Sequence, residues 1–313
     1  MIGYILRRLI ATAPVMLIVA VLVFLMLRLT PGDPAAIIAG DNANNEQIAL
    51  IRNRLGLDQP LVTQFFIWIG NIFRGDFGES FFFKKTVGEL IASRLEPTIA
   101  LSVATIVIAV AVAVPLGVLA AYKQGTLIDK IVMGFSVLGF SVPVFVIGYS
   151  LIYLFAIKLN WLPVQGYQRI GDGFGGFLQR LILPSITLSV IYIALIARMT
   201  RTSVLDVMGE DYIRTARAKG QAERNVLFRH ALKNAAVPIV TVIGLGIALL
   251  IGGVVVTESV FTIPGIGRLT VDAVLARDYP TIQAVILLFS FVYVLINLLV
   301  DLLYCAFDPR IRY

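Results

Sequence analysis

The sequence predicts an all-α, polytopic membrane protein with six transmembrane helices and a helical insertion after the first of them. Three observations lead to this fold class. Apolar residues make up 58% of the 313 residues and charged residues only 14%, whereas a soluble domain carries about 25% charged residues. Six stretches approach the roughly 20 apolar residues that span a bilayer. The basic residues gather in short segments between these stretches, as is typical of inner loops.

The six predicted spans are residues 9–27, 99–122, 131–156, 181–197, 235–256 and 281–300. The first follows Arg7 and Arg8, but its apolar run is longer than the 7–15 residues of a signal-peptide core. We therefore expect an uncleaved anchor. The fourth is short, and its helix is expected to extend outward to Phe177. The predicted organisation is an anchor region at 1–29, an outer segment at 30–98 and a five-helix core at 99–313 with an inner loop at 198–236.

The outer segment is long enough to have its own fold or function. It predicts one helix at 46–55, with Asn45 available as N-cap and Gly56 as its stop. A second helix at 61–73 is short and aromatic, which suits a position at the membrane interface. A turn is expected at RGDFGES, followed by a short helix at 87–94.

The distribution of charge predicts the orientation of the chain. If the amino terminus is cytoplasmic, the inner segments hold 14 Lys or Arg against 6 Asp or Glu, and the outer segments hold 12 against 12. This arrangement obeys the positive-inside rule, so both termini are expected on the cytoplasmic side of the membrane. The same rule accounts for the basic excess, which therefore does not indicate nucleic-acid binding.

Several function classes are excluded by missing residues. The sequence has no Gly-Lys dipeptide, so it has no P-loop for ATP. One cysteine and one histidine allow neither a disulfide framework nor a Cys/His metal cluster. No Ser/Asp or carboxylate set accompanies His230, so no catalytic site is predicted. The six spans contain no Asp, Glu, Lys, Arg or His, which favours an energy source outside the membrane.

Glycine and proline recur in the third and fifth spans. Gly139, Pro143 and Gly244 are the candidates for a pathway wall, because kinked and closely packed helices can border a water-filled cavity. Ordinary close packing of membrane helices explains the same residues. The sequence leaves both interpretations open.

The inner loop contains GEDYIRTARAKG, which predicts a short helix. Acidic residues begin it, basic residues end it and Gly220 stops it, in agreement with the helix dipole. A second helical pattern follows and runs into the fifth span at Pro238. Such a projecting helix can dock in a groove of another protein or lie along lipid headgroups, and the residues alone do not separate these alternatives.

The stretch 210–238, EDYIRTARAKGQAERNVLFRHALKNAAVP, resembles the ATPase-coupling loop of binding-protein-dependent ABC importer permeases. More narrowly, the chain is similar to the first permease subunit of the dipeptide, oligopeptide, nickel and glutathione branch. The segments LTPGDP, GDFGES, TESVFTIPGIGRL and DLLYCAFDPRIRY fit the same subunit, so the resemblance covers essentially the whole chain. It departs from the general Glu-Ala-Ala pattern, because Arg214-Thr215-Ala216 stands there with Gly220 in register.

The resemblance implies a type I ABC importer permease fold and import of di- or oligopeptides or related solutes such as glutathione, with nickel chelates as an alternative. It implies a second homologous permease subunit, two cytoplasmic ATPases that use ATP and magnesium, and a periplasmic or lipid-anchored binding protein. No cofactor is expected on this chain, and no enzymatic activity of its own. An ion-coupled carrier and a membrane scaffold without transport are the rival functions.

The resemblance also assigns candidate site residues, and none of them is catalytic or a metal ligand. ATPase coupling is expected of Glu210, Asp211, Tyr212, Arg214, Ala216, Ala218, Lys219 and Gly220. Support of the coupling loop is expected of His230, Asn234 and Pro238. Contact with the binding protein is expected of Glu258, Pro264, Gly265, Gly267 and Asp278, and a purely structural cap over the helix bundle explains the same segment equally well.

Overall fold

The computed structural model describes residues 2–29, 35–36, 43–54, 56–80 and 82–307. These form two compact units. Unit 1 comprises residues 1–96 and 265–295, and unit 2 comprises residues 97–264 and 296–313. Two segments of the resemblance, LTPGDP and the DPRIRY end of the tail, fall largely outside the described residues.

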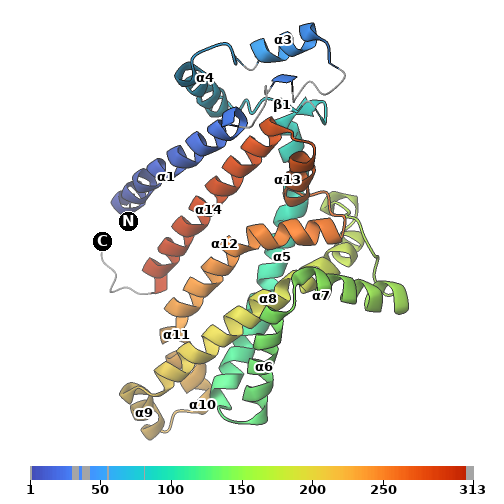
Figure 1. Cartoon of the computed structure of the whole chain (residues 1–313). Coiled ribbons are helices and arrows are strands. Elements are labelled where there is room, and N and C mark those ends of the chain that lie inside the picture. Colours follow the sequence, from blue (N-terminus) through green and yellow to red (C-terminus); the bar gives the residue numbers. More distant parts are fainter. Residues whose placement is uncertain (1, 30–34, 37–42, 55, 81, 308–313) are drawn as a thin grey trace. The chain divides into compact units, whose positions relative to one another are not determined.

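Unit 1 is built of helices around one short hairpin (Figure 1). Its elements are α1 (Ile2–Leu29), α3 (Asn45–Arg54), α4 (Leu61–Phe73), β1 (Glu79–Ser80), β2 (Lys85–Thr86), the start of α5 (Val87–Tyr122), α13 (Ile266–Leu275) and the start of α14 (Tyr279–Phe307). The strands β1 and β2 pair antiparallel with Glu79 opposite Thr86. The sequence predicted only a turn in this region.

The helix α3 confirms the predicted helix at 46–55 but moves its cap by one residue. The Asn44 side chain accepts a hydrogen bond from the Gln47 N–H at 2.8 Å, and the Gln47 side chain accepts one from the Asn44 N–H. This reciprocal pair is a capping box, so Asn44 and not Asn45 is the N-cap, and Asn45 is the first residue of the helix. Gly56 follows the helix at φ +62°, as predicted for its stop.

The helix α4 packs one face against α1. The Phe24 and Phe65 rings meet edge to face at 5.3 Å, and Arg28 Nε donates to the buried Gln64 at 3.1 Å. On the opposite face Phe66 and Phe73 are exposed. An uncharged helix with such a face is typical of the membrane interface, so this position stays our prediction for α4.

Two elements predicted separately at 87–94 and 99–122 form the single helix α5. The cause is packing in unit 1, because Val87, Leu90 and Ile91 are buried in a cluster with Ile266 and Leu269 of α13 and with residues of α14. Helical geometry is thereby fixed before the apolar span begins. The proline at 97 lies inside the helix without ending it.

Unit 2 is a helical bundle that carries the inner loop (Figure 1). Besides the rest of α5 it contains α6 (Leu127–Ser141), α7 (Val144–Leu151), η1 (Ile152–Lys158), η2 (Ile170–Asp172), α8 (Phe174–Met208), α9 (Asp211–Ala218), α10 (Glu223–Asn225), η3 (Val226–Ala231), α11 (Leu232–Asn234) and α12 (Ala236–Val260). The helix α8 extends the fourth predicted span at both ends, outward as expected and also inward.

Among the described residues, α5, α8, α12 and α14 are each long and apolar enough to cross a membrane, and the helices from Leu127 to Lys158 give a fifth crossing if they are counted as one. The first predicted span lies in α1, whose apolar part, Ile10–Met26, is shorter. The third predicted span, residues 131–156, needs correction, because its helix is broken and bent by 104° between Ser141 and Val144. Val142 precedes Pro143 and takes an extended conformation, as residues before proline do.

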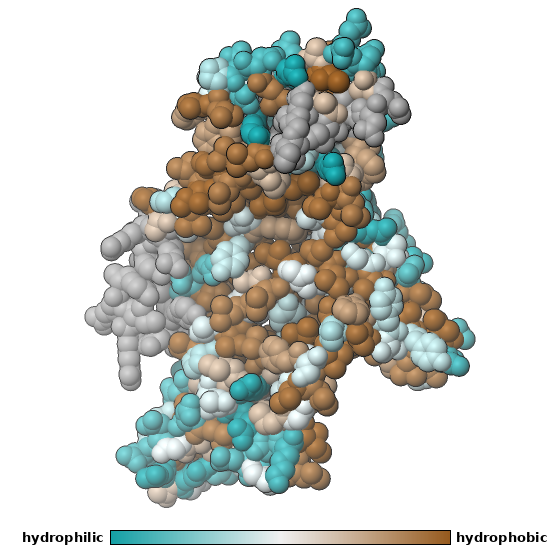
Figure 2. Space-filling view, viewed as in Figure 1, coloured by the Kyte–Doolittle hydropathy of each residue, from teal (hydrophilic) through white to brown (hydrophobic). Residues whose placement is uncertain are grey.

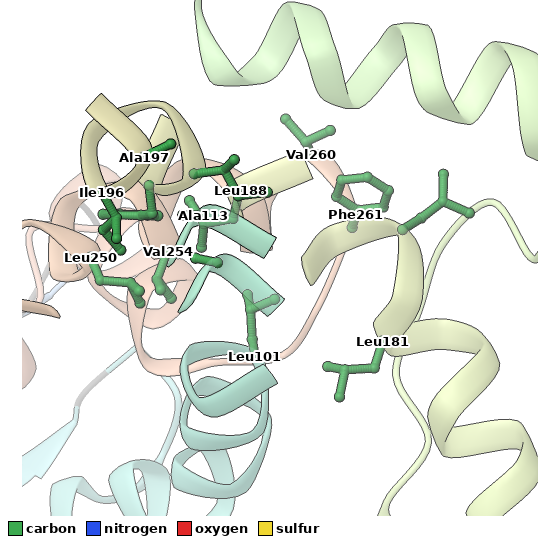
Figure 3. Packing of buried hydrophobic residues seen from close by; sticks show 14 of the residues in the cluster. Leu101, Ala113, Leu181, Leu188, Ile196, Ala197, Leu250, Val254, Val260 and Phe261 are labelled. Atoms are coloured by element: carbon green, nitrogen blue, oxygen red, sulfur yellow. The ribbon is translucent and has the colours of Figure 1, made fainter. Parts of the chain in front are cut away.

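The core of unit 2 lies around α8. Leu188, Ile196 and Ala197 of α8 face Ala113 of α5 and Val254 of α12 in one buried cluster (Figure 3). Membrane helices associate mainly through close packing of this kind. Lipid tails are as apolar as these side chains, so the hydrophobic effect does not drive the helices together. The helix α8 is therefore the common support of α5, α6, α7 and α12, and the inner loop begins at its end.

Candidate functional site

The helix α9 is an eight-residue helix with well-formed ends. Glu210 precedes it with extended backbone, and Asp211 lies in its first turn. At the other end the Gly220 N–H donates to the Arg217 carbonyl at 2.9 Å, and the Gln221 N–H donates to the Ala216 carbonyl at 3.3 Å. These two bonds form a Schellman motif, which requires the positive φ of +76° that Gly220 adopts.

A buried side chain attaches α9 to the rest of unit 2. Ile213 is fully buried in an apolar cluster with Val118 and Ala121 of α5, Val204 of α8, residues of η3, and Ala235 and Ile239 at the start of α12. A buried isoleucine contributes about 1.5–3 kcal/mol of apolar burial. Three long helices, α5, α8 and α12, thus contribute to the cluster that surrounds Ile213.

Polar contacts connect α9 with the chain that returns to α12. Asn234 Nδ2 donates to the Tyr212 hydroxyl at 3.0 Å and to the His230 carbonyl at 2.8 Å. His230 Nε2 and Gln221 Oε1 lie 2.9 Å apart. Through these contacts the structure brings the predicted support residues His230 and Asn234 to α9, while Pro238 lies in the first turn of α12.

The exposed face of α9 carries charged and small side chains. Asp211 and Arg214 form an ion pair at 3.2 Å and are 94% and 75% exposed. Ala218 and Lys219 are exposed as well, and Ala216 is half-buried. Hydrophilic side chains gather at this end of unit 2 (Figure 2). The arrangement is a short helix with one face held by the buried Ile213 and the opposite face exposed.

The remaining ion pair of the loop lies between α9 and α10. Arg217 Nε donates to Glu223 at 2.8 Å, with both side chains about two-fifths exposed. An exposed pair of this kind contributes little stability. It does bring the last turn of α9 beside α10, which keeps the loop compact.

Comparison with known proteins identifies the family. The family model described as binding-protein-dependent transport system inner membrane component matches residues 113–313, and the model of the N-terminal part of such components matches residues 1–102. The chain belongs to this permease family. Permeases of this family work with ATPase and substrate-binding partners.

Individual relatives agree with this assignment. The permease is 58% identical over 310 residues, 99% of each chain, to a "probable peptide ABC transporter permease protein" of Sinorhizobium fredii. It is 47% identical over the whole of both chains to the glutathione transport system permease protein GsiC of Salmonella typhi. An inward-facing structure of the MetNI methionine ABC transporter matches with a TM-score of 0.56 and 18% identity, over 70% of this chain and 96% of that one. The last match shows the common fold.

The residues expected to contact a binding protein differ in exposure. In unit 2, Glu258 is fully buried and accepts a hydrogen bond from Thr98 at 2.6 Å, while Pro264 is exposed. In unit 1, Gly265 and Gly267 are buried at the start of α13, which begins at Ile266. Pro264 is the member of the set whose exposure suits contact with a partner.

Asp278, the last of that set, is buried at the start of α14. Its Oδ2 accepts hydrogen bonds from Ser80 at 2.5 Å and Thr281 at 2.6 Å. The carboxylate therefore holds the hairpin of unit 1 against α14. This is a supporting contact inside the permease.

The three candidates for the pathway wall lie at helix contacts or bends. A Cβ on Gly139 would lie 2.9 Å from the Ala194 Cβ, and one on Gly244 would collide with Val300. Pro143 is the N-cap of α7, directly after the bend. Close packing therefore accounts for the two glycines, and a role of these residues in the pathway stays a prediction.

Two features of the site were missed from the sequence. The burial of Ile213 is one, although a single isoleucine in a highly charged helix was an available signal. The other is the ion pair between Asp129 and Arg201, at the base of the helix that leads to α9. These two residues are 72 positions apart, and no local pattern relates them.

Proposed function

We propose that this permease forms part of an ATP-driven importer of di- or oligopeptides or related small solutes such as glutathione. The observation that carries the proposal is the construction of α9, which is anchored by one buried isoleucine and offers an exposed charged face to a partner. The names of the peptide and glutathione relatives support the substrate class. The comparisons do not favour an ion-coupled carrier.

In this mechanism two cytoplasmic ATPases bind ATP and magnesium, and each receives one coupling helix. Closure of the ATPases moves α9, and the Ile213 cluster transfers the movement to α5, α8 and α12. The pathway then opens outward, accepts a solute and resets after hydrolysis. The chain itself contributes no catalytic group and no cofactor site to these steps.

The remaining partners follow from the same proposal. A second, homologous permease subunit completes the pathway as a heterodimer, and a periplasmic or lipid-anchored binding protein delivers the solute. Since the ATPases are cytoplasmic, α9 and both termini lie on the cytoplasmic side. Pro264 lies on the opposite side, where the binding protein docks.

Reconstitution tests this function. The permease, its partner subunit and the two ATPases are placed in liposomes, and ATP hydrolysis and solute uptake are measured with and without the binding protein encoded alongside. Stimulated hydrolysis with uptake of the peptide or glutathione released from that binding protein is the expected result. Uptake by the permease that persists without ATP and stops with an uncoupler would contradict the proposal.

A matched pair of glycines tests the role of the end of α9. Gly220, after the end of α9, has φ +76° and no neighbour within 4 Å of its Cβ position. Gly209, before the start of α9, has φ −78°. Alanine at position 220 therefore costs about 1–2 kcal/mol through backbone strain, and alanine at 209 costs little. We expect Gly220→Ala to lower ATP-driven uptake several-fold and Gly209→Ala to leave it unchanged, as measured by initial uptake rates at equal permease content.

A further inference from the structure

A buried ion pair lies near the C-terminal end of α8, close to the start of the coupling loop. Arg201 Nε donates to Asp129 Oδ1 at 2.5 Å, and Arg201 Nη2 donates to Asp129 Oδ2 at 2.8 Å. The Asp129 side chain is 6% exposed and the Arg201 side chain 22%. Two parallel bonds between a guanidinium and a carboxylate fix orientation as well as distance.

The same carboxylate also closes the turn between α5 and α6. The Gly125 N–H donates to Asp129 Oδ2 at 2.9 Å, and Gly125 takes a φ of +79° that the turn requires. One side chain thus connects the turn after α5, the first turn of α6 and the inner part of α8. All of these contacts lie within unit 2.

Close helix packing continues this connection along α8. A Cβ on Gly117 of α5 would lie 2.6 Å from the Thr200 Cβ and 2.7 Å from the Ala197 carbonyl oxygen. A Cβ on Gly139 of α6 would lie 2.9 Å from the Ala194 Cβ. The helices α5 and α6 therefore approach α8 without intervening side chains, and the ion pair closes the inner end of this three-helix contact.

The position of the pair relates it to coupling. Val204, one turn beyond Arg201 on α8, lies in the cluster that seats Ile213 of α9. The helix α6 has no residue in that cluster. Among the described residues, the Asp129–Arg201 pair is the ion pair that joins α6 to α8. A movement of α9 reaches α8 directly. It reaches α6 through the contact of α6 with α8, whereas α7 packs on both α8 and α12.

We infer that Asp129 and Arg201 are positioning residues for energy coupling, which make α6 follow α8 when the coupling helix moves. This inference rests on the proposed function. A buried ion pair adds little stability over an apolar pair of the same shape, but removing one partner leaves an uncompensated charge. Stability and coupling are therefore separable by mutation, because neutralising both partners removes the lone charge and also removes the bidentate bond.

The test compares Asp129→Asn, Arg201→Gln and the double variant in the reconstituted complex. Thermal stability in detergent and the number of ATP molecules hydrolysed per solute imported are measured for each. We expect the single variants to be less stable than wild type and the double variant to recover most of the loss. We expect the ATP consumed per solute to rise at least fivefold in all three. Lys130→Gln and Arg198→Gln, two exposed neighbours on the same helices, are the controls with unchanged ratios.

The outcomes separate this inference from the function on which it rests. A double variant whose stability and whose ratio of ATP to solute both return to the wild-type values would overturn the positioning role while leaving the importer intact. The pair would then serve stability alone. A wild-type complex without ATP-dependent uptake would instead contradict the proposed function.

Discussion

Replacing Ile213 with aspartate is expected to abolish ATP-driven uptake while the permease still inserts into the membrane. The side chain is fully buried in the cluster that seats α9. An uncompensated buried charge costs about 3–5 kcal/mol. Since about 1.4 kcal/mol is a tenfold change in an equilibrium, the seated population of α9 should fall by at least about 100-fold.

The measurement is uptake and binding-protein-stimulated ATPase activity of the reconstituted complex. Ile213→Leu is the matched control, because a swap of nearly equal volume preserves the seat at a cost below about 1.5 kcal/mol. Both activities should survive in the leucine variant and be lost together in the aspartate variant. Wild-type uptake by a correctly inserted Ile213→Asp permease would show that α9 needs no seat on unit 2.

The second large effect is expected at Gly117, where α5 approaches α8 most closely. Even a Cβ at this position would lie within 3 Å of Thr200 and of the Ala197 carbonyl. A backbone atom cannot move aside as a flexible side chain can, so Gly117→Leu must separate the two helices. Overpacking of this kind typically costs about 1–3 kcal/mol and can exceed that range, and we expect a loss of about 3 kcal/mol or more.

Gly134 of α6 supplies the matched control for this experiment. It is a helical glycine with no neighbour within 4 Å of its Cβ position, and it is exposed. Gly134→Leu should keep the wild-type yield and thermal stability of the detergent-purified permease, while Gly117→Leu should lose most of both. Equal stability of the two leucine variants would contradict the close contact between α5 and α8.

Local signals made α9 predictable. Acidic residues at its start, basic residues at its end and a glycine after it all act within a single turn of helix, so the residues alone placed the helix and its stop. The same locality explains α3 and its Gly56. The exact cap of α3 was missed because Asn44 and Asn45 are chemically equivalent and only backbone geometry selects one.

Contacts between distant segments were beyond prediction. The bond from Ser80 to Asp278 joins residues 198 positions apart, so Asp278 looked like an exposed loop residue although it is buried. The burial of Glu258 was equally unpredictable, since its partner Thr98 is 160 positions away. A charged residue beside an apolar span gives no sign of whether it faces a partner protein or a buried hydroxyl.

Breaks in helices were only partly predictable. Pro143 indicated a kink in the third span, but a bend of 104° also depends on how α6 and α7 each pack on α8. Conversely, the two elements predicted at 87–94 and 99–122 form one helix that continues through Pro97, because burial of the first turns of α5 in unit 1 keeps the helix continuous. Tertiary packing decided both cases.

Labelling of a single thiol on α9 tests the account most directly. Cys305 is the only cysteine of the sequence, so Thr215→Cys in a Cys305→Ser background offers one thiol at an exposed site of the coupling helix. A membrane-impermeant maleimide should leave intact cells unlabelled, react once the inner side of the membrane is accessible, and be blocked when the ATPases are bound. Complete labelling from outside intact spheroplasts would contradict the claim that α9 transmits force from cytoplasmic ATPases.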